Sequence, residues 1–320
     1  MNKSVSVLIP SIAVAIAMAL LVYIFKPITF LPISYGICLP SPDVWQIPPF
    51  VSWIVNSFFI GLTTLILYFL NKSFNFIRTT EPVLPSLFLI FTCSNPWSTQ
   101  ELNTSVFLCL INVVCLGIIF GSYSQKNATH QLFTVGVLWG IGSMFQYAFL
   151  PMIFVGLLWA SFMKVFRLKE VLAFFGGFIC PYWIAYGFGI ITLTDFHFPA
   201  LVSLFDTGRD HTDILLLLLG IGLAAFSGFL LSIMEGIRLY AGNSRVYSMN
   251  LCVTTLGAVS LICMAIDYEN FTSYTSTLYF AVATAFANIC ALWHHISRPW
   301  LVTAIPAFIY ILLFAGIFFL

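Results

Sequence analysis

The chain has 320 residues, of which 61% are hydrophobic, 17% aromatic and 7% charged, and its formal net charge is +1. Soluble domains carry about 25% charged residues, so this composition and the mean hydropathy of +1.03 exclude a soluble protein and indicate an integral membrane protein. The charge balance offers no basic patch for nucleic acid, and no alternation of polar and apolar residues suggests barrel strands, so we expect membrane-spanning helices.

Gaps between charged residues mark the expected spans, because about 20 apolar residues cross the hydrocarbon core. The first helix is expected near residues 5–25, and its apolar core is longer than that of a signal peptide, so we interpret it as an uncleaved anchor. The segment 82–99 carries three prolines and is expected to be short and irregular. The other single spans are expected near residues 50–70, 104–122, 170–191, 213–233, 248–266, 273–291 and 300–320.

One apolar run has an unusual length. Between His130 and Lys164 the chain passes through 33 residues without a charge. As one helix they would measure about 50 Å, too long for one ordinary crossing and too short for two complete crossings with a turn. We therefore predict two shortened helices that meet near Gln146, Tyr147 and Pro151, within a hairpin over residues 130–163.

The placement of basic residues predicts the orientation. We expect about eleven crossings, or nine to eleven given the irregular regions, with the amino terminus inside the cytoplasm. Lys26 and Arg209 would then be the two basic residues outside, against ten inside. The prediction is an all-α transmembrane bundle in which residues 1–320 form one integral domain of the inner (plasma) membrane. The ten inside residues are Lys3, Lys72, Arg78, Lys126, Lys164, Arg167, Lys169, Arg238, Arg245 and Arg298.

The stretch DFHFPALVSLFDTGRDHTD, residues 195–213, concentrates charge in a chain that has little. As a cation or substrate site it would bring Asp195 and His197 together with Asp210, His211 and Asp213. The simpler interpretation is a solvated outer loop, because the outer loops are expected to hold eight of the eleven acidic residues, Asp267 among them. We favour the solvated loop.

Other polar residues lie at the expected membrane interface or inside the membrane. Arg78 and Glu81, in RTTEP, either bind a phosphate or pair at a helix end, and Glu170 is expected to cap a helix or to pair beside Lys169. Gln146 and Tyr147 interrupt the hairpin and are candidate substrate-binding residues. No acidic or basic residue is placed near a bilayer centre, which disfavours ion-coupled transport and leaves a neutral-substrate pathway open.

The eight cysteines are scattered, without a CxxC pair or a histidine at zinc-ligand spacing. Most fall in apolar runs, where cysteine behaves as a small hydrophobic residue. We therefore expect no metal ion and no other cofactor.

The first outer loop, from Lys26 to about Pro49, contains one acidic residue, Asp43 in SPDVWQIPP, and is followed by short, irregular helices. In this arrangement residues 1–190 resemble the membrane core of GT-C glycosyltransferases, which use lipid-linked sugar donors. The resemblance implies Asp43 as the catalytic base, a metal or pyrophosphate at the 195–213 loop, and a polyprenyl donor in the outer leaflet. The chain departs from the family in lacking a paired acidic motif in this loop and a large outer domain.

The competing class is a membrane protein without catalysis. It is either an accessory subunit of an envelope machine or a carrier of a neutral or lipidic substrate. We favour this class, because the sequence holds no strong catalytic constellation. The expected partners are membrane lipids, with a lipid-linked substrate or other envelope proteins as further candidates, and no nucleic acid.

Overall fold

The computed structural model describes residues 5–25, 36–77, 82–196, 215–240, 243–267, 270–292 and 300–317. These residues form helices and no strand. Within them, five helices are long and apolar enough to cross a membrane, and the predicted helical membrane protein is confirmed at this level. The five segments are Leu8–Phe25, Pro49–Phe74, Thr104–Gly121, Leu168–Gly187 and Ser244–Ile266.

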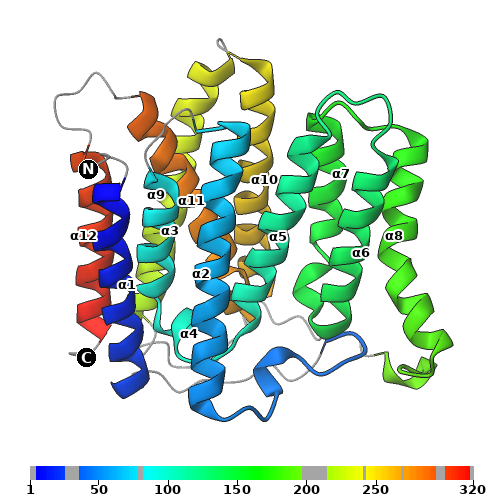
Figure 1. Ribbon diagram of the computed structural model, residues 1–320, viewed down its shortest axis with the longest axis horizontal. Coiled ribbons are helices and arrows are strands. Elements are labelled where there is room, and N and C mark those ends of the chain that lie inside the picture. Colours follow the sequence, from blue (N-terminus) through cyan, green and yellow to red (C-terminus); the bar gives the residue numbers. More distant parts are fainter. Residues whose placement is uncertain are drawn as a thin grey trace.

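The helices stand side by side, and consecutive long helices run in opposite directions (Figure 1). The first group is α1 (Val5–Phe25), α2 (Pro49–Phe74), α3 (Val83–Cys93), α4 (Pro96–Thr99) and α5 (Thr104–Gly121). Next come α6 (Thr129–Phe145), α7 (Met152–Phe162) and α8 (Leu168–Gly187). The last group is α9 (Leu215–Tyr240), α10 (Ser244–Ile266), α11 (Phe271–Leu292) and α12 (Trp300–Ile317).

Both irregular regions break where the sequence places its interruptions. The expected 82–99 segment divides into α3 and α4, because Pro96 begins a new helix and Asn95 caps it by accepting a hydrogen bond from Trp97 N. In the hairpin, α6 ends before Gln146, a 3-10 turn spans Tyr147–Phe149, and α7 begins after Pro151. The prediction of two shortened helices is therefore confirmed.

The helix α11 forms the centre of the bundle and contacts α3, α5, α9, α10 and α12. It is buried over almost its whole length although its first turns are rich in hydroxyl groups. Ser105 of α5 donates a 2.7 Å hydrogen bond to Ser276 Oγ and accepts one of 2.9 Å from Ser276 N. In a bundle whose surface is as apolar as its core, such polar contacts between helices stabilise the packing.

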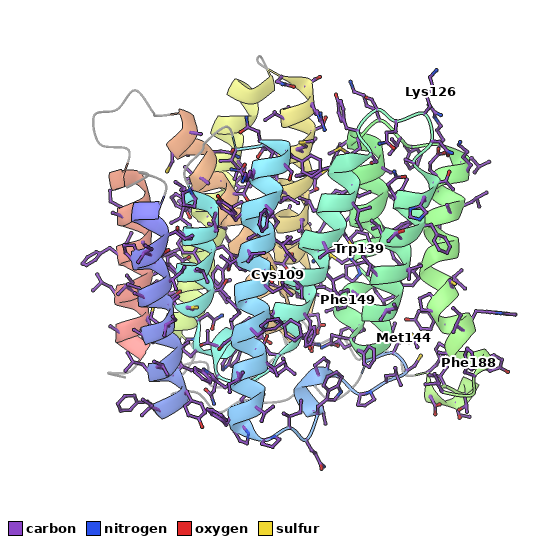
Figure 2. All side chains as sticks on the ribbon, viewed as in Figure 1. Cys109, Lys126, Trp139, Met144, Phe149 and Phe188 are labelled. Atoms are coloured by element: carbon purple, nitrogen blue, oxygen red, sulfur yellow. The ribbon has the colours of Figure 1, made fainter. Side chains whose placement is uncertain are left out.

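Charged side chains segregate to the two ends of the bundle. One end, which we call the basic end, holds every lysine and arginine side chain that the structure describes. The opposite end, the acidic end, holds Glu101, Asp195 and Asp267, whereas Glu170 lies at the basic end beside Lys169. In Figure 2, Lys126 marks the basic end, while Met144 and Phe188 mark the acidic end. The basic side chains are Lys72, Lys126, Lys164, Arg167, Lys169 and Arg245.

Candidate functional site

The structure leaves part of the predicted site undescribed. Of Asp43 it describes the backbone, which lies in the 3-10 turn Pro42–Val44. Five predicted residues fall outside the described ranges, namely Arg78, Glu81, His197, Asp210 and His211. The choice between a solvated loop and a converging site for residues 195–213 therefore stays a prediction.

The segment that carries Asp43 packs against the acidic end of α6. Cys38 N and Leu39 N both donate hydrogen bonds to the Met144 carbonyl, at 3.2 and 2.9 Å. The ring of Trp45 meets Phe145 edge-on, with centroids 6.1 Å apart. These contacts hold the segment against the α6–α7 turn.

Asp195 has a local structural role. Its Oδ2 accepts hydrogen bonds from Thr192 N at 2.7 Å and from Thr192 Oγ1 at 2.9 Å, which closes the capping box of a short 3-10 turn. The carboxylate thus stabilises the short turn that follows α8.

Gln146 and Tyr147, at the turn of the hairpin, lie near other polar side chains. Gln146 is 1% exposed and accepts a 3.0 Å hydrogen bond from Tyr147 N, while its Nε2 is buried and has no hydrogen-bond partner among the described residues. Tyr147 lies within electrostatic range of Tyr274 on α11, which in turn lies close to Asp267. Asp267 is 3% exposed and accepts a 2.8 Å hydrogen bond from Asn270 Nδ2.

Asp267 is expected in an outer loop, and the structure places it just after α10 with its side chain buried. It is the C-cap of α10, and its backbone N–H donates a hydrogen bond to the Cys263 carbonyl. Sequence reasoning did not bring Tyr274 together with Tyr147 and Asp267. The signal was the run of hydroxyl residues that opens an otherwise apolar helix at residues 272–277.

A groove lies between α1 and α2 at the edge of the bundle, and we call it the lateral groove. Its volume is about 570 Å³, its floor is α3, and its lining is almost wholly apolar. Only 28% of the α1 span and 33% of the α2 span are buried, so most residues of both helices are not covered by other helices. The groove is lined, among others, by Ile12, Ile16, Trp53, Ile60, Gly61, Leu65, Phe69, Leu89 and Cys93.

The lateral groove runs along the bundle axis. Its lining on α2 extends from Trp53 to Phe69, which corresponds to about 24 Å at 1.5 Å per residue. A side chain added at Gly61 would meet nothing within 4 Å, so the groove is open at that point. Toward the acidic end, Tyr23 packs on Trp53 with ring centroids 5.1 Å apart, the kind of aromatic pair that membrane proteins place near the bilayer interface.

Buried polar side chains lie around α4, a helix that both α1 and α2 contact. Asn56 Nδ2 donates a 2.7 Å hydrogen bond to the Ser98 carbonyl. Asn56 Oδ1, Ser98 Oγ and Gln100 Oε1 are buried and have no hydrogen-bond partner among the described residues. A buried polar atom left without a partner costs about 1–3 kcal/mol, so three of them call for water or a ligand. We call Asn56, Ser98 and Gln100 the polar triad.

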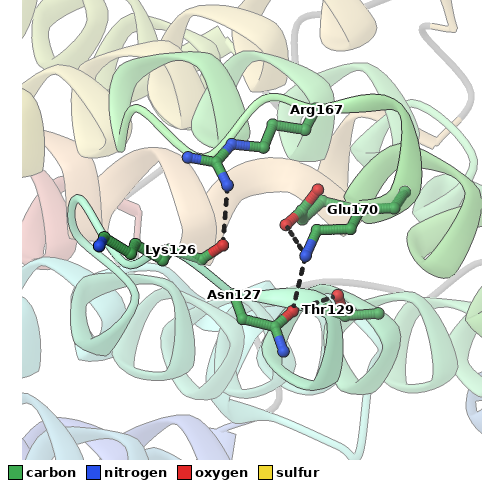
Figure 3. A network of polar contacts seen from close by, with 6 residues as sticks. Lys126, Asn127, Thr129, Arg167 and Glu170 are labelled. Carbon is green, nitrogen blue, oxygen red and sulfur yellow. Dashed lines mark hydrogen bonds and ion pairs between the residues drawn. The ribbon is translucent and has the colours of Figure 1, made fainter.

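The polar contacts at the basic end are structural (Figure 3). Arg167 Nη1 donates a 2.8 Å hydrogen bond to the Lys126 carbonyl, and Lys169 Nζ donates one of 3.1 Å to Asn127 Oδ1. Lys169 Nζ also lies 3.5 Å from Glu170 Oε1. Glu170 is in the first turn of α8, where the helix dipole stabilises a carboxylate. The network fastens the loop before α6 to the start of α8, and Glu170 pairs as predicted.

Comparison with known proteins finds no relative of this chain. No protein-family model matches the chain, and no curated protein or solved structure is similar to it. Among the described residues no group of three or more His, Cys, Asp or Glu side chains is placed to hold a metal ion. The function of this protein therefore has to follow from its own residues.

Proposed function

We propose that this protein is a carrier of a lipidic substrate, which it binds through the lateral groove. The single observation that carries the proposal is the groove itself, an apolar cavity of about 570 Å³ between two helices that face the bilayer. At this depth the surrounding medium is hydrocarbon, so the chain of a membrane lipid is the molecule available to fill it. A polar headgroup would then lie toward one end of the bundle.

The proposal includes an orientation in the inner membrane. We propose that α1 to α3 and α5 to α12 cross the bilayer, giving eleven crossings with the amino terminus inside. The segregation of charge supports this, because α1 begins at the basic end and cytoplasmic segments carry an excess of lysine and arginine. The acidic end then faces outward.

A photo-crosslinking experiment tests the groove. The purified protein is reconstituted in phosphatidylethanolamine and phosphatidylglycerol vesicles with a trace of lipid bearing a diazirine on its acyl chain. We expect crosslinked peptides to map to α1 and α2. The variant Gly61→Phe should reduce these crosslinks by about tenfold, since Gly61 lines the groove, has open space around an added Cβ, and the ring would take up groove volume.

The matched control is Gly176→Phe on α8. Gly176 also lies on an apolar helix and has nothing within 4 Å of an added Cβ, but it lies far along the bundle from the groove. This variant should crosslink like the wild type. Equal labelling of wild type and Gly61→Phe, or labelling mainly on α8, would contradict the proposal.

The glycosyltransferase alternative has one observation in its favour. The segment that carries Asp43 is held at the acidic end, on the proposed outer face, where transfer from an outer-leaflet donor would take place. Release of sugar from a lipid-linked donor by the wild type, and its loss in Asp43→Asn with unchanged folding, would favour an enzyme over a carrier.

A further inference from the structure

The basic end of the bundle carries a cluster of positive charge around one tyrosine. Tyr123 follows α5, Lys164 follows α7, and Arg245 lies in the first turn of α10. We infer that these three side chains, with the hydroxyl groups of Ser124 and Ser244, bind the headgroup phosphate of an anionic phospholipid. We call these five residues the tyrosine site. The inference goes beyond the proposed function, because it concerns a different part of the bundle and a different lipid contact.

Two positive charges meet on the ring of Tyr123. Lys164 Nζ lies 5.7 Å from the ring centroid, and the guanidinium carbon of Arg245 lies 5.9 Å from it. The face of an aromatic ring attracts cations at such distances. The three residues are far apart in the sequence, so the packing of the helices brings both cations to one ring. An anion near this ring is attracted by both charges at once.

Hydrogen-bonding groups gather at the hydroxyl end of the ring. Tyr123 Oη lies 3.2 Å from Ser244 Oγ. The hydrogen bond with Ser244 and the nearby Lys164 ammonium lower the pKa of Tyr123, although partial burial raises it. Ser124 N donates a 3.0 Å hydrogen bond to the Met163 carbonyl, which fastens the turn after α5 to the turn that carries Lys164. Phosphate oxygens accept hydrogen bonds from hydroxyl, ammonium and guanidinium groups, so these donors suit a phosphate.

Local backbone structure does not account for the two charges. Lys164 has a φ of 60°, in the left-handed region, where the residue that follows a helix is most often glycine. Arg245 lies in the first turn of α10, where the helix dipole disfavours a cation. Residues held in unfavourable local positions are typical of binding sites, where the side chain supplies what a better-suited residue would lack.

The depth of the tyrosine site identifies its occupant as a lipid headgroup. α5 ends at Gly121, α7 ends at Phe162 and α10 begins at Ser244, so the site lies at the ends of three proposed crossings. Basic residues between helix ends at this depth bind anionic headgroups. Lys164, Ser244 and Arg245 are exposed, so a headgroup can reach them.

The same part of the bundle also offers apolar surface for acyl chains. Phe154 and Leu158 are 68% and 41% exposed, and they lie one turn apart on α7, the helix that leads to Lys164. A lipid bound by its phosphate can therefore lay a chain along α7, whereas a free phosphate ion would gain nothing from this surface.

Lipid titration of the purified full chain tests the inference. Phosphatidylglycerol or phosphatidylcholine with the same acyl chains is added in a neutral detergent, and bound lipid is counted by native mass spectrometry. We expect phosphatidylglycerol to bind about tenfold more tightly. Lys164→Gly and Arg245→Gln should each lower this preference about fivefold, since one basic residue contributes roughly that factor to anionic lipid binding. Lys164→Arg keeps the charge and should retain the preference.

Two variants separate binding from folding and from net charge. Lys164→Gly relaxes the left-handed backbone at residue 164, so its unfolding temperature without lipid should not fall below that of the wild type. Lys72→Gln is the matched control, because Lys72 is an exposed lysine in the last turn of α2, also at the basic end. It removes the same charge and should keep the wild-type preference.

Several results would overturn the inference. Equal binding of the two lipids by the wild type would mean that the chain itself satisfies the two cations. An unchanged preference in Lys164→Gly and Arg245→Gln, or an equal loss in Lys72→Gln, would show a diffuse surface charge instead of a site. Displacement of phosphatidylglycerol by an equal concentration of sodium phosphate would make a soluble anion the ligand. None of these results depends on crosslinking in the lateral groove, so this inference and the proposed function fail separately.

Discussion

Gly177 on α8 lies against the backbone carbonyl of Phe133 on α6, with no space between them for a Cβ atom. Gly136 and Gly140 on α6 make the reciprocal approach to the backbone of α8 near Phe174 and Phe178. Small residues four positions apart allow two helix backbones to approach closely in a membrane, where van der Waals packing drives association. This contact joins α6 and α8 along the edge of the bundle (Figure 1).

Replacing Gly177 by valine should therefore disrupt the α6–α8 pair. The added side chain would overlap the Phe133 carbonyl, and overpacking of this kind costs about 1–3 kcal/mol or more because backbone has to move. We expect a lower unfolding temperature in detergent and a reduced yield of folded protein. Gly176→Val is the control, since Gly176 is next to Gly177 in the sequence but has open space around an added Cβ. If both variants unfold alike, the close approach is not what holds these helices together.

A pair of asparagines joins three parts of the bundle near the basic end. Asn288 Nδ2 on α11 donates a 2.7 Å hydrogen bond to Asn250 Oδ1 on α10, and Asn250 Nδ2 donates one of 3.0 Å to the Phe76 carbonyl. Hydrogen bonds between membrane helices contribute about 0.6 kcal/mol on average and up to about 1.7. A double-mutant cycle of Asn250→Ala and Asn288→Ala, measured by unfolding in detergent, should give a coupling energy in this range. Strictly additive effects would argue that the pair contributes nothing.

The proposed orientation predicts which exposed positions react with an impermeant maleimide. In a background with Cys38 and Cys180 replaced by serine, Thr194→Cys at the acidic end should be labelled in intact cells. Gln125→Cys, which is exposed at the basic end, should be labelled only after the membrane is permeabilised. Labelling of Gln125→Cys from outside would reverse the orientation and move the polar triad to the cytoplasmic face.

The native Cys38 should react slowly. Burial, and secondarily the nearby Asp195 carboxylate, raise the pKa of the Cys38 thiol above its ordinary value. A raised pKa lowers the fraction of reactive thiolate at a given pH, so the alkylation rate at pH 8 should be below that of a free thiol and should rise as the pH increases. Asp195→Asn removes the smaller of the two causes and should speed the reaction. A slower reaction in that variant would contradict the electrostatic contribution.

Several structural features follow from local sequence. Pro96 and the residues Gln146 to Pro151 stop helices by removing or redirecting backbone hydrogen bonds, and the structure breaks at both places. The pairing of Lys169 with Glu170 is likewise a contact between neighbours in the sequence. The candidate site was harder to predict. Asp267 is separated from Tyr147 by 120 positions, and its burial depends on the packing of the helices.

The amino-acid sequence by itself determined that this is a helical membrane protein, where its hairpin breaks, and that its charges are confined to the ends of apolar segments. These properties depend on the free energy of transferring each segment from water to hydrocarbon. That free energy is determined by residues that are close together along the chain. Only the tertiary structure decided that α1 and α2 enclose a groove over α3 and that Asn56, Ser98 and Gln100 lie buried around α4. The physical reason is that side chains facing lipid and side chains facing another helix are equally apolar, so hydrophobicity does not select which helices become neighbours.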